Sequence, residues 1–356
     1  MKKILHLFLT KNKGGIESYI INNWKYINKN KFMFYFALQD DVDYSIELGE
    51  DARQLLFDRK NIIKTSVDMI RIIRRENINI VHIHKNSLSD ISAILTVLFF
   101  TKAKVIIHSH NTRPKINAFC VRLLHKLNKK IVSLLSVTRL ACSSKAANWM
   151  FGDNDSVVVF YNGIDFEKFK FDEEKRRVIR GKYKIRDNTL LIGLVANLIE
   201  QKNIPKLIRI FLAVKKQKTA RLMLVGDGPL KEKLKAIVDE LDENNNVFFV
   251  GAVRNVSDYL SAFDAMVMPS FYEGLPISAI ECQANGCPLT ISSNVDRMVE
   301  ITNAVRFLSV NDADSKWGEA VLDNNRQKKN VNFSGSYKDF NIGESVKKIE
   351  IIYSKM

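Results

Sequence analysis

Two glutamates eight positions apart, Glu273 and Glu281, are the residues whose spacing points most directly to chemistry. The apolar run Ala265 to Pro269 predicts a strand, Gly274 permits unusual backbone angles, and Pro276 suits the first turn of a helix. We therefore expect Glu273 on the loop before that helix and Glu281 a little over one turn inside it. Backbone N–H groups at a helix start bind phosphate, and ionised carboxylates accept hydrogen bonds from sugar hydroxyls. The pattern indicates a nucleotide-sugar site.

This segment, together with the following Ala284-Asn285-Gly286-Cys287-Pro288, resembles the signature of family 4 retaining glycosyltransferases. The resemblance implies the GT-B fold, an α/β architecture of two doubly wound Rossmann-like domains that face a central cleft. The tail from Phe340 to Tyr353 is similar to that of the exopolysaccharide, capsule and O-antigen branch. The other matches follow the family's order and extend the resemblance over essentially the whole chain: Gly14-Gly15-Ile16-Glu17, His108-Ser109-His110-Asn111-Thr112, Asn162-Gly163-Ile164-Asp165, Gln201-Lys202-Asn203 and Val225-Gly226-Asp227-Gly228.

Short aliphatic and β-branched runs alternate with longer amphipathic segments, which is the pattern of parallel sheets covered on both faces. Two such series in 356 residues predict two doubly wound domains. We place the first at residues 1–166, completed by a helix over 343–356, and the second at 167–342. The predicted strands are Ile4–Leu9, Phe32–Leu38, Ile78–His84, Val105–His108, Arg139–Cys142, Val157–Phe160, Leu190–Val195, Leu222–Val225, Val247–Val250, Ala265–Pro269 and Leu289–Ile291.

In the first domain, two groups follow predicted strands at the carboxyl ends, where doubly wound sheets place their sites. Gly14 and Gly15 let the backbone approach a ligand closely. The resemblance implies that they contact the β-phosphate of the donor, and a plain turn is the alternative. A histidine can donate to a sugar hydroxyl or carry charge near neutral pH. The resemblance implies that His110 contacts the reaction centre and that His108 is buried in its strand.

Lys202 lies just after a predicted strand of the second domain. In the family that the chain resembles, an arginine and a lysine five positions apart hold the diphosphate and stabilise the charge that grows as it departs. Lys202 occupies the lysine position, but Asn197 stands where the arginine is expected. An asparagine amide brings neither charge nor a bidentate fork. Either another cation substitutes, with Lys13 and Arg254 as candidates, or the enzyme is slow, or the motifs align differently.

The resemblance assigns different parts of the donor to the two glutamates. Glu281 is expected at the ribose hydroxyls, and a solvated helix carboxylate is the alternative. Glu273 is expected at the transferred sugar, with Gly274 and Leu275 beside it in the donor site. Arg254 resembles the position that packs near the nucleobase, and a surface arginine is the alternative.

Composition indicates a globular protein, with 46% hydrophobic and 26% charged residues. We find no secretory signal and no apolar run long enough to span a bilayer. Because the four cysteines lack metal-ligand spacing, we expect reduced core thiols, no metal site and no cofactor.

The net charge of +16 is unevenly distributed. No acidic residue occurs from Ile91 to Gly152, whereas ten basic residues do. Within this stretch, Lys115 to Arg139 predicts a basic amphipathic helix, which can lie on an anionic membrane. A core-packing helix with a solvated face is the alternative. The residues expected to contact the membrane or the acceptor are Arg122, Lys126, Lys129 and Lys130.

These features indicate a retaining glycosyltransferase that moves a hexose or N-acetylhexosamine from a nucleotide diphosphate sugar, with UDP as the expected nucleotide. The expected acceptor is a growing or polyprenyl-diphosphate-linked glycan at the cytoplasmic face of the membrane, and no nucleic-acid partner is expected. No residue is arranged as an evident nucleophile, so we expect front-face displacement supported by positioning and charge stabilisation.

Other functions remain open at this stage. A nucleotide-sugar epimerase would need carboxylates able to move protons, and a dehydrogenase would need a complete dinucleotide fingerprint. Gly226-Asp227-Gly228 lacks the third glycine of that fingerprint and predicts a strand-to-helix turn. A catalytically weak glycan-binding protein is the alternative that Asn197 keeps open.

Overall fold

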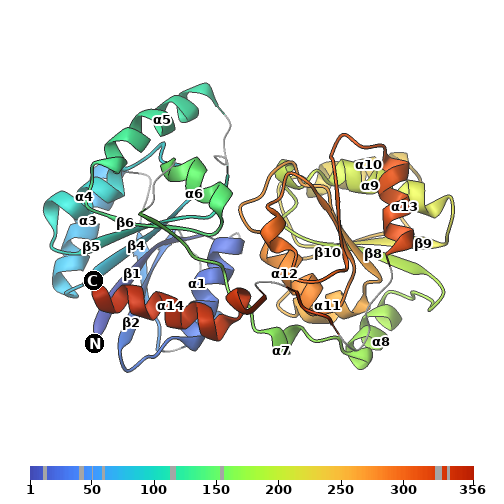
Figure 1. The fold of residues 1–356 in the computed structure, drawn as a ribbon, viewed down its shortest axis with the longest axis horizontal. Coiled ribbons are helices and arrows are strands. Elements are labelled where there is room, and N and C mark those ends of the chain that lie inside the picture. The colour runs from blue at the N-terminus through green and yellow to red at the C-terminus, as the bar shows by residue number, and fades with distance from the viewer. Residues whose placement is uncertain are drawn as a thin grey trace. The chain divides into compact units, whose positions relative to one another are not determined.

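The computed structural model describes residues 1–10, 14–39, 44–49, 51–57, 61–112, 118–152, 156–324, 331–334 and 337–356. The chain forms two compact units, one of residues 1–163 with 338–356 and one of residues 164–337. Each unit is a parallel sheet with helices on both faces (Figure 1). The predicted fold class, two Rossmann-like α/β domains, is confirmed.

The first unit contains a seven-stranded sheet in the order β3-β2-β1-β4-β5-β6-β7. Its strand pairs are parallel. Chain order reverses between the neighbours β1 and β4, so their carboxyl ends form the switch point at which doubly wound sheets place ligands. The strands are β1 (Lys2–Leu9), β2 (Phe32–Gln39), β3 (Arg53–Phe57), β4 (Ile80–Lys85), β5 (Lys104–Ser109), β6 (Thr138–Ala141) and β7 (Val157–Val159).

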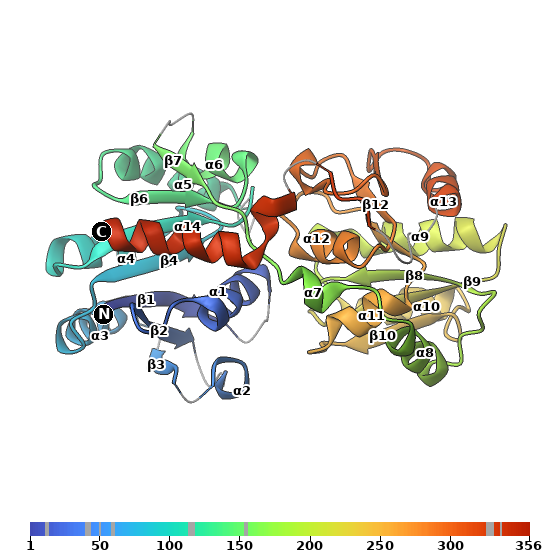
Figure 2. The same cartoon turned by 60° about the horizontal axis from the view of Figure 1, so that its bottom comes forward.

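Two helical layers cover this sheet because successive side chains of a strand point to opposite faces. Ile80 packs with α1 (Gly15–Tyr26) and α14 (Ile342–Lys355), whereas Val81 packs in the opposite core. Figure 2 shows α14 lying along one face of the sheet. The other helices of this unit are α2 (Ser45–Leu48), α3 (Ile62–Arg75), α4 (Ser92–Phe100), α5 (Phe119–Ser133) and α6 (Ser144–Phe151).

The second unit contains a six-stranded parallel sheet in the order β10-β9-β8-β11-β12-β13. Its switch point lies between β8 and β11. The strands are β8 (Leu190–Val195), β9 (Ala220–Val225), β10 (Val247–Gly251), β11 (Ala265–Met268), β12 (Leu289–Ser292) and β13 (Val305–Leu308). The helices are α7 (Phe166–Phe169), α8 (Glu173–Lys182), α9 (Ile204–Lys215), α10 (Lys231–Glu240), α11 (Val256–Ala262), α12 (Ile277–Ala284) and α13 (Asp314–Asp323).

Two strands, β3 and β13, are absent from the strands predicted from the sequence, and both are edge strands. β3 reads Arg-Gln-Leu-Leu-Phe, and only its last residue, Phe57, is buried. In β13 only Val305 is buried. An edge strand pairs on one side and does not need both faces covered, so it can lack the continuous apolar run by which the other strands, including the edge strands β7 and β10, were recognised.

Candidate functional site

Two loops of the second unit start at its switch point. One follows β8 and runs from Ala196 through a 3₁₀ turn at Glu200–Lys202 into α9. The other follows β11 and leads into α12. Because β8 and β11 are paired neighbours, parallel strands bring both loops to the same edge of the sheet. The predicted residues Asn197, Lys202, Glu273 and Glu281 lie on these loops or on α12.

The loop after β8 is held against the loop after β9. Gly226 has φ +138°, and a Cβ atom there would lie 1.9 Å from the carbonyl oxygen of Ala196. The Leu198 N–H donates to the Asp227 carbonyl over 2.9 Å. The Gly226-Asp227-Gly228 segment does lead from a strand towards a helix, as expected. Its glycines also allow the close approach that sets the path of the loop carrying Asn197.

Backbone hydrogen bonds join the two switch-point loops. The Phe271 N–H donates to the Gln201 carbonyl at 2.9 Å. Asn203 has φ +51°, a left-handed conformation that asparagine tolerates better than most residues. Its side-chain Nδ2 donates to the Pro269 carbonyl at 3.1 Å. These contacts bring the residues after β8 against the loop that carries Glu273.

Lys202 and Glu273 form an ion pair inside this joined pair of loops. The Lys202 Nζ lies 2.6 Å from Glu273 Oε1, and the two side chains are only 14% and 6% exposed. Gln201 Nε2 donates to the other carboxylate oxygen, Oε2, at 2.8 Å. Gln201 is a site residue that the sequence analysis quoted in a motif without giving it a role. Because the ion pair is shielded from water, its charges act on a neighbouring ligand more strongly than they would in solvent.

The start of α12 differs in detail from the expectation. Pro276 is the N-cap rather than a helical residue, and α12 begins at Ile277. Gly274 does not have a positive φ, so unusual backbone angles do not explain why a glycine stands at this position. Gly274 and Leu275 are buried beside Glu273. The placement of Glu281 a little over one turn into the helix is confirmed.

Glu281 is a half-buried carboxyl group on α12. Burial raises its pKa to about 7, and the nearby Lys168 ammonium of α7 lowers the pKa only in part. The carboxyl group is therefore poised between its neutral and charged forms near neutral pH. A ligand that donates hydrogen bonds to the carboxylate would favour the charged form. The alternative of a fully solvated helix carboxylate is wrong for this residue.

The remaining donor-site candidates of the second unit occupy different positions. Asn197 is half-buried in the turn after β8. Arg254 is exposed between β10 and α11, and β10 lies two places from β8 in the sheet. Lys13, the other candidate to replace the missing arginine, lies outside the described residues. Lys202 is therefore the cation that the structure places within this pair of loops.

In the first unit, Gly14 and Gly15 lie where the chain enters α1. Gly14 is the N-cap, and its N–H donates to Glu17 Oε2 at 3.0 Å. Thr10 donates to Glu17 Oε1 from its N–H, at 3.2 Å, and from its hydroxyl, at 2.9 Å. A Cβ added at Gly15 would meet no atom of the described residues within 4 Å. The buried Glu17 carboxylate thus accepts hydrogen bonds from both Thr10 and Gly14.

Five histidines share the face of the first sheet that α1 and α14 cover. They are His6 on β1, His82 and His84 on β4, and His108 and His110 at the end of β5. Their i, i+2 spacing along β4 and β5 is a sequence signal that we did not use, because alternate residues of a strand share a face. We call these five residues the histidine cluster.

His110 lies at the outer end of the histidine cluster. Its Nε2 lies 2.9 Å from His84 Nδ1. Burial lowers the pKa of His110 to about 3, so its imidazole is neutral at neutral pH. Of the two roles considered for His110, the structure favours a neutral hydrogen-bonding group over a charge carrier. His108 is fully buried, as expected.

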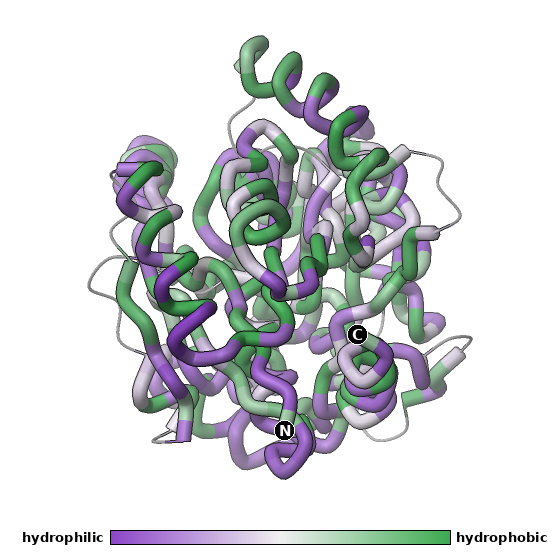
Figure 3. Tube along the Cα trace, turned by 90° about the vertical axis from the view of Figure 1, so that its left-hand side faces the viewer, coloured by the Kyte–Doolittle hydropathy of each residue, from purple (hydrophilic) through white to green (hydrophobic). Residues whose placement is uncertain are grey.

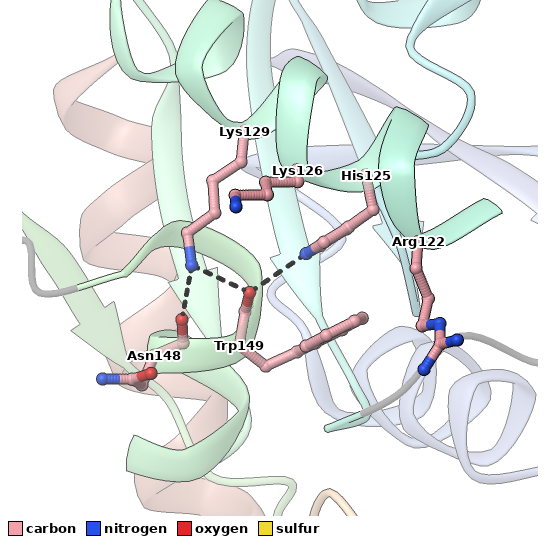
Figure 4. A pocket seen from close by; sticks show the side chains of 6 residues that line it. All are labelled: Arg122, His125, Lys126, Lys129, Asn148 and Trp149. Atoms are coloured by element: carbon pink, nitrogen blue, oxygen red, sulfur yellow. Dashed lines mark hydrogen bonds between the residues drawn. The ribbon is translucent and has the colours of Figure 1, made fainter. Parts of the chain in front are cut away.

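The basic residues expected to contact a membrane lie on α5, and they differ in exposure and in hydrogen bonding. Arg122, Lys126 and Lys130 are exposed. Lys129 instead donates from Nζ to the carbonyl oxygens of Asn148, at 2.9 Å, and Trp149, at 3.2 Å (Figure 4). These carbonyls belong to the last turns of α6, where a cation is favourable. Lys129 thus differs from the other three because its ammonium group bonds within the protein, and its contact with a membrane or acceptor stays a prediction.

A surface pocket of about 330 Å³ lies between α5 and α6. His125 stacks on the Trp149 ring with centroids 4.0 Å apart, and its Nδ1 accepts from the Leu88 N–H at 3.0 Å. Figure 4 shows both rings within the basic surroundings of this pocket. The pocket is lined by Arg122, His125, Lys126, Lys129, Asn148 and Trp149.

The apolar side of α5 is exposed rather than packed in the core. Only His125 and Val132 of this helix are buried. Figure 3 shows hydrophobic and hydrophilic residues interleaved along α5 at the top of the view. The alternative of a core-packing helix is therefore wrong for most of its apolar residues. Leu124 is exposed, and five further exposed apolar residues recur every three or four positions and share one side: Phe119, Leu123, Leu127, Ile131 and Leu134. Within the described part of the chain, no helix has the length and apolar character needed to cross a bilayer.

Comparison with known proteins identifies the family. The profile of the glycosyl transferases group 1 family matches residues 175–348. The putative glycosyltransferase EpsF of Bacillus subtilis is 30% identical over 339 residues, with 90% of this chain and 87% of EpsF covered. The UDP-Gal:alpha-D-GlcNAc-diphosphoundecaprenol alpha-1,3-galactosyltransferase of Escherichia coli is 22% identical, with 99% of this chain and 97% of that enzyme covered.

Among solved structures, Anabaena Alr3699/HepE in complex with UDP and glucose matches with a TM-score of 0.81 at 16% identity, over the full length of both chains. That likeness shows the shared fold. The identity to EpsF over most of both chains, together with the family match, sets aside the epimerase and dehydrogenase alternatives. The chain therefore belongs to the glycosyl transferases group 1 family and is a glycosyltransferase.

Proposed function

We propose that this glycosyltransferase moves a hexose or N-acetylhexosamine from a UDP-sugar to a lipid-linked or growing surface polysaccharide, with retention of anomeric configuration. The buried Lys202–Glu273 pair at the switch point of the second sheet is the observation that carries the proposal. The Escherichia coli relative is named for a UDP-galactose donor and a diphosphoundecaprenol-linked acceptor, and HepE has been solved with UDP and glucose. These names support UDP as the nucleotide and a lipid-linked glycan as the acceptor.

In the proposed donor site, each part of the nucleotide sugar meets a different group. Glu281 accepts from the ribose hydroxyls, and Arg254 packs near the nucleobase. Lys202 holds the diphosphate through the N–H bonds of its ammonium group that do not donate to Glu273. The side-chain amide of Asn197 aids this contact. Glu273 accepts from hydroxyls of the transferred sugar while Gln201 and Lys202 fix its orientation. Gly274 and Leu275 shape the backbone beside it.

The first unit contributes groups to the same reaction in this proposal. The backbone at Gly14 and Gly15, with no atom of the described residues within 4 Å of a Cβ added at Gly15, contacts the β-phosphate. The neutral imidazole of His110 hydrogen-bonds to the transferred sugar at the reaction centre. Since the pKa of His110 lies far below neutral pH, its imidazole is neutral at and around neutral pH and acts there as a hydrogen-bonding group.

We propose a front-face displacement for the chemical step. The bond from the anomeric carbon to the phosphate oxygen breaks while the acceptor oxygen bonds to that carbon from the same side. The acceptor proton passes to the departing phosphate oxygen. Charge grows on the diphosphate in the transition state, where the Lys202 ammonium group stabilises it. The protein otherwise acts by positioning, and the reaction proceeds without a resident metal or cofactor.

We propose that α5 holds the enzyme at an anionic membrane surface, where a lipid-linked acceptor would be found. The exposed apolar side of the helix can enter the interface, while Arg122, Lys126 and Lys130 meet the headgroups. The basic pocket between α5 and α6 is a candidate contact for the acceptor's phosphate groups. The protein would then be peripheral at the inner face of the cell membrane.

Radiolabelled transfer tests the proposed function. Full-length protein is incubated with UDP-glucose, UDP-galactose, UDP-N-acetylglucosamine or UDP-N-acetylgalactosamine and a membrane lipid fraction. Label should enter the lipid phase from at least one donor, with the α configuration by NMR and unchanged yield in a chelator of divalent cations. An inverted product would overturn the retaining mechanism, and absence of transfer from every donor would overturn the proposed donors.

A further inference from the structure

The histidine cluster contains more nitrogen atoms than the protein provides hydrogen bonds for. Among the residues that the structure describes, five buried ring nitrogens have no hydrogen-bond partner: His6 Nε2, His82 Nε2, His108 Nδ1, His108 Nε2 and His110 Nδ1. His108 is fully buried and has no partner for either nitrogen. A neutral imidazole carries one N–H and one lone pair. Buried groups of this kind normally bind something, so each unpartnered nitrogen needs an explanation.

Three members of the histidine cluster are arranged as metal ligands. His84, His108 and His110 each offer one nitrogen, and these three atoms lie within 4.8 Å of one another. His84 Nδ1 and His110 Nε2 are 2.9 Å apart. Two imidazoles on one tetrahedral Zn²⁺ would have nitrogens about 3.3 Å apart for Zn–N bonds of about 2.0 Å. An opening of a few tenths of an ångström would admit the ion between these two residues.

The second nitrogen of His84 already has the partner that a metal ligand needs. His84 Nε2 lies 3.0 Å from His6 Nδ1. If His84 binds the ion through Nδ1, its Nε2–H donates to His6. Metal-binding histidines usually make such a contact through the other nitrogen, which fixes the tautomer and orients the ring. His6 would therefore support the site without touching the ion.

A second triad, His6, His82 and His84, has similar spacing but is a poorer site. His82 Nδ1 is hydrogen-bonded to the Tyr353 hydroxyl at 2.8 Å, and both His6 and His82 are fully buried. His108 of the first triad is also fully buried, but His84 keeps 9% of its surface and His110 is half-buried, so two of its three residues are partly exposed, against one in the second triad. The two triads share His84, which faces His110 through Nδ1 and His6 through Nε2.

We propose that His84, His108 and His110 bind one divalent transition-metal ion, with Zn²⁺ as the preferred ion. Three imidazole ligands suit Zn²⁺, Cu²⁺ or Ni²⁺ rather than the oxygen-seeking Mg²⁺ or Ca²⁺. Three protein ligands leave the fourth position for water.

The consequence for catalysis rests on the proposed function, in which His110 contacts the transferred sugar. Metal binding would take His110 away from the sugar. Zn²⁺ is therefore an inhibitor of the transfer and not its cofactor, which agrees with the proposed metal-independent step.

Metal titration of the full-length protein tests the site without any activity assay. After treatment with a chelator, Zn²⁺ is titrated against a chromogenic competitor, and Co²⁺ absorption reports tetrahedral coordination. We expect one equivalent to bind. His110→Gln and His108→Gln should each weaken binding at least about 10- to 100-fold, and His6→Phe should weaken it by a similar factor as an orienting partner. His125→Gln, outside the cluster, should leave zinc binding unchanged.

Circular dichroism and retained UDP binding establish that each variant is folded, and His110→Gln carries the test if His108→Gln does not fold. The proposal is overturned if the folded parent binds no equivalent of Zn²⁺, or if His110→Gln binds it as the parent does. Absence of transferase activity in the parent would affect the proposed function only, because the binding measurement does not use it. Activity that Zn²⁺ leaves unchanged at full occupancy would overturn the inhibitory role.

Discussion

The Glu281→Gln substitution probes the buried carboxyl group of the proposed ribose contact. The ordinary pKa of a glutamate is 4.5, and burial raises that of Glu281 to about 7. The folded protein therefore binds a proton more tightly than the unfolded chain does. Stability contributed by this group is lost as pH rises from 4.5 through 7, because the unfolded state releases the proton first. Glutamine has the same shape and no titration, so the substitution removes this loss.

The magnitude follows from the difference between the two pKa values. Each pKa unit corresponds to about 1.4 kcal/mol, so titration of this group lowers the stability of the fold, relative to low pH, by about 1 kcal/mol at pH 5 and by about 3 kcal/mol at pH 8. The stability of Glu281→Gln relative to the parent should thus rise by about 2 kcal/mol between these pH values. For a unit of this size that corresponds to about 4 to 8 °C in the midpoint of thermal unfolding.

Thermal unfolding of parent and variant from pH 5 to pH 8 measures this difference directly. Replacing the carboxyl group with an amide has its own effect on stability, but that effect does not change with pH. It therefore cancels when only the pH dependence of the parent and the variant is compared. Glu319→Gln on α13 is the matched control, because Glu319 is exposed in the same unit. If the parent and Glu281→Gln midpoints run parallel over this pH range, the raised pKa of Glu281 is wrong.

Donor binding should show the reverse dependence on pH. Ribose hydroxyls donate to the ionised carboxylate, so the affinity of the parent for UDP-glucose should rise as pH increases through 7. The gain is limited to about 20-fold between pH 5.5 and 7.5, since below the pKa each pH unit costs tenfold. Calorimetry should show proton release in the parent and none in Glu281→Gln. Glu281→Ala should weaken affinity more than it slows turnover, because the ribose is bound alike in ground and transition states. Equal affinity and equal pH dependence in the parent and both variants would place the ribose elsewhere.

Three further changes test other parts of the molecule. Lys202→Ala should lower kcat about 10²- to 10³-fold, as the loss of a transition-state charge stabiliser does. Because removing Lys202 alone leaves the buried Glu273 carboxylate without its cation, the double variant Lys202→Met with Glu273→Gln is the folding control. Retention of most turnover by Lys202→Ala would place the diphosphate clamp elsewhere. Asn197→Arg should raise kcat, because it places a cation at the position where the arginine was expected. An unchanged kcat with unchanged donor affinity would show that residue 197 does not face the diphosphate. When three exposed basic side chains of α5 become glutamine, partitioning onto anionic vesicles at low salt should fall about 100-fold, at about 1 kcal/mol per residue, as measured by sedimentation. Lys129→Gln should instead mainly lower thermal stability. Equal pelleting of the parent and the triple variant, or pelleting that does not depend on salt, would refute the membrane surface. The three are Arg122, Lys126 and Lys130.

The sequence alone determined the central strands and the loops that carry the site. Parallel strands buried on both faces must be apolar along their whole length, so runs such as Leu190–Val195 stood out from their surroundings. Doubly wound sheets place ligands after such strands, which located Lys202 and Glu273 before any contact was known. The edge strands β3 and β13 escaped recognition because they lack an apolar run, whereas the edge strands β7 and β10 keep one and were predicted.

Only the tertiary structure decided which side chains meet and in what state they stand. Lys202 and Glu273 are 71 positions apart, and no local pattern predicts that their charges lie at 2.6 Å. The pKa of Glu281 depends on how deeply α12 is buried against its neighbours, which spacing does not report. Lys129 looked like the other lysines of α5 until α6 placed its carbonyl groups within reach. Spacing along the chain records local geometry, whereas ion pairing and burial depend on atoms that come from distant parts of the chain.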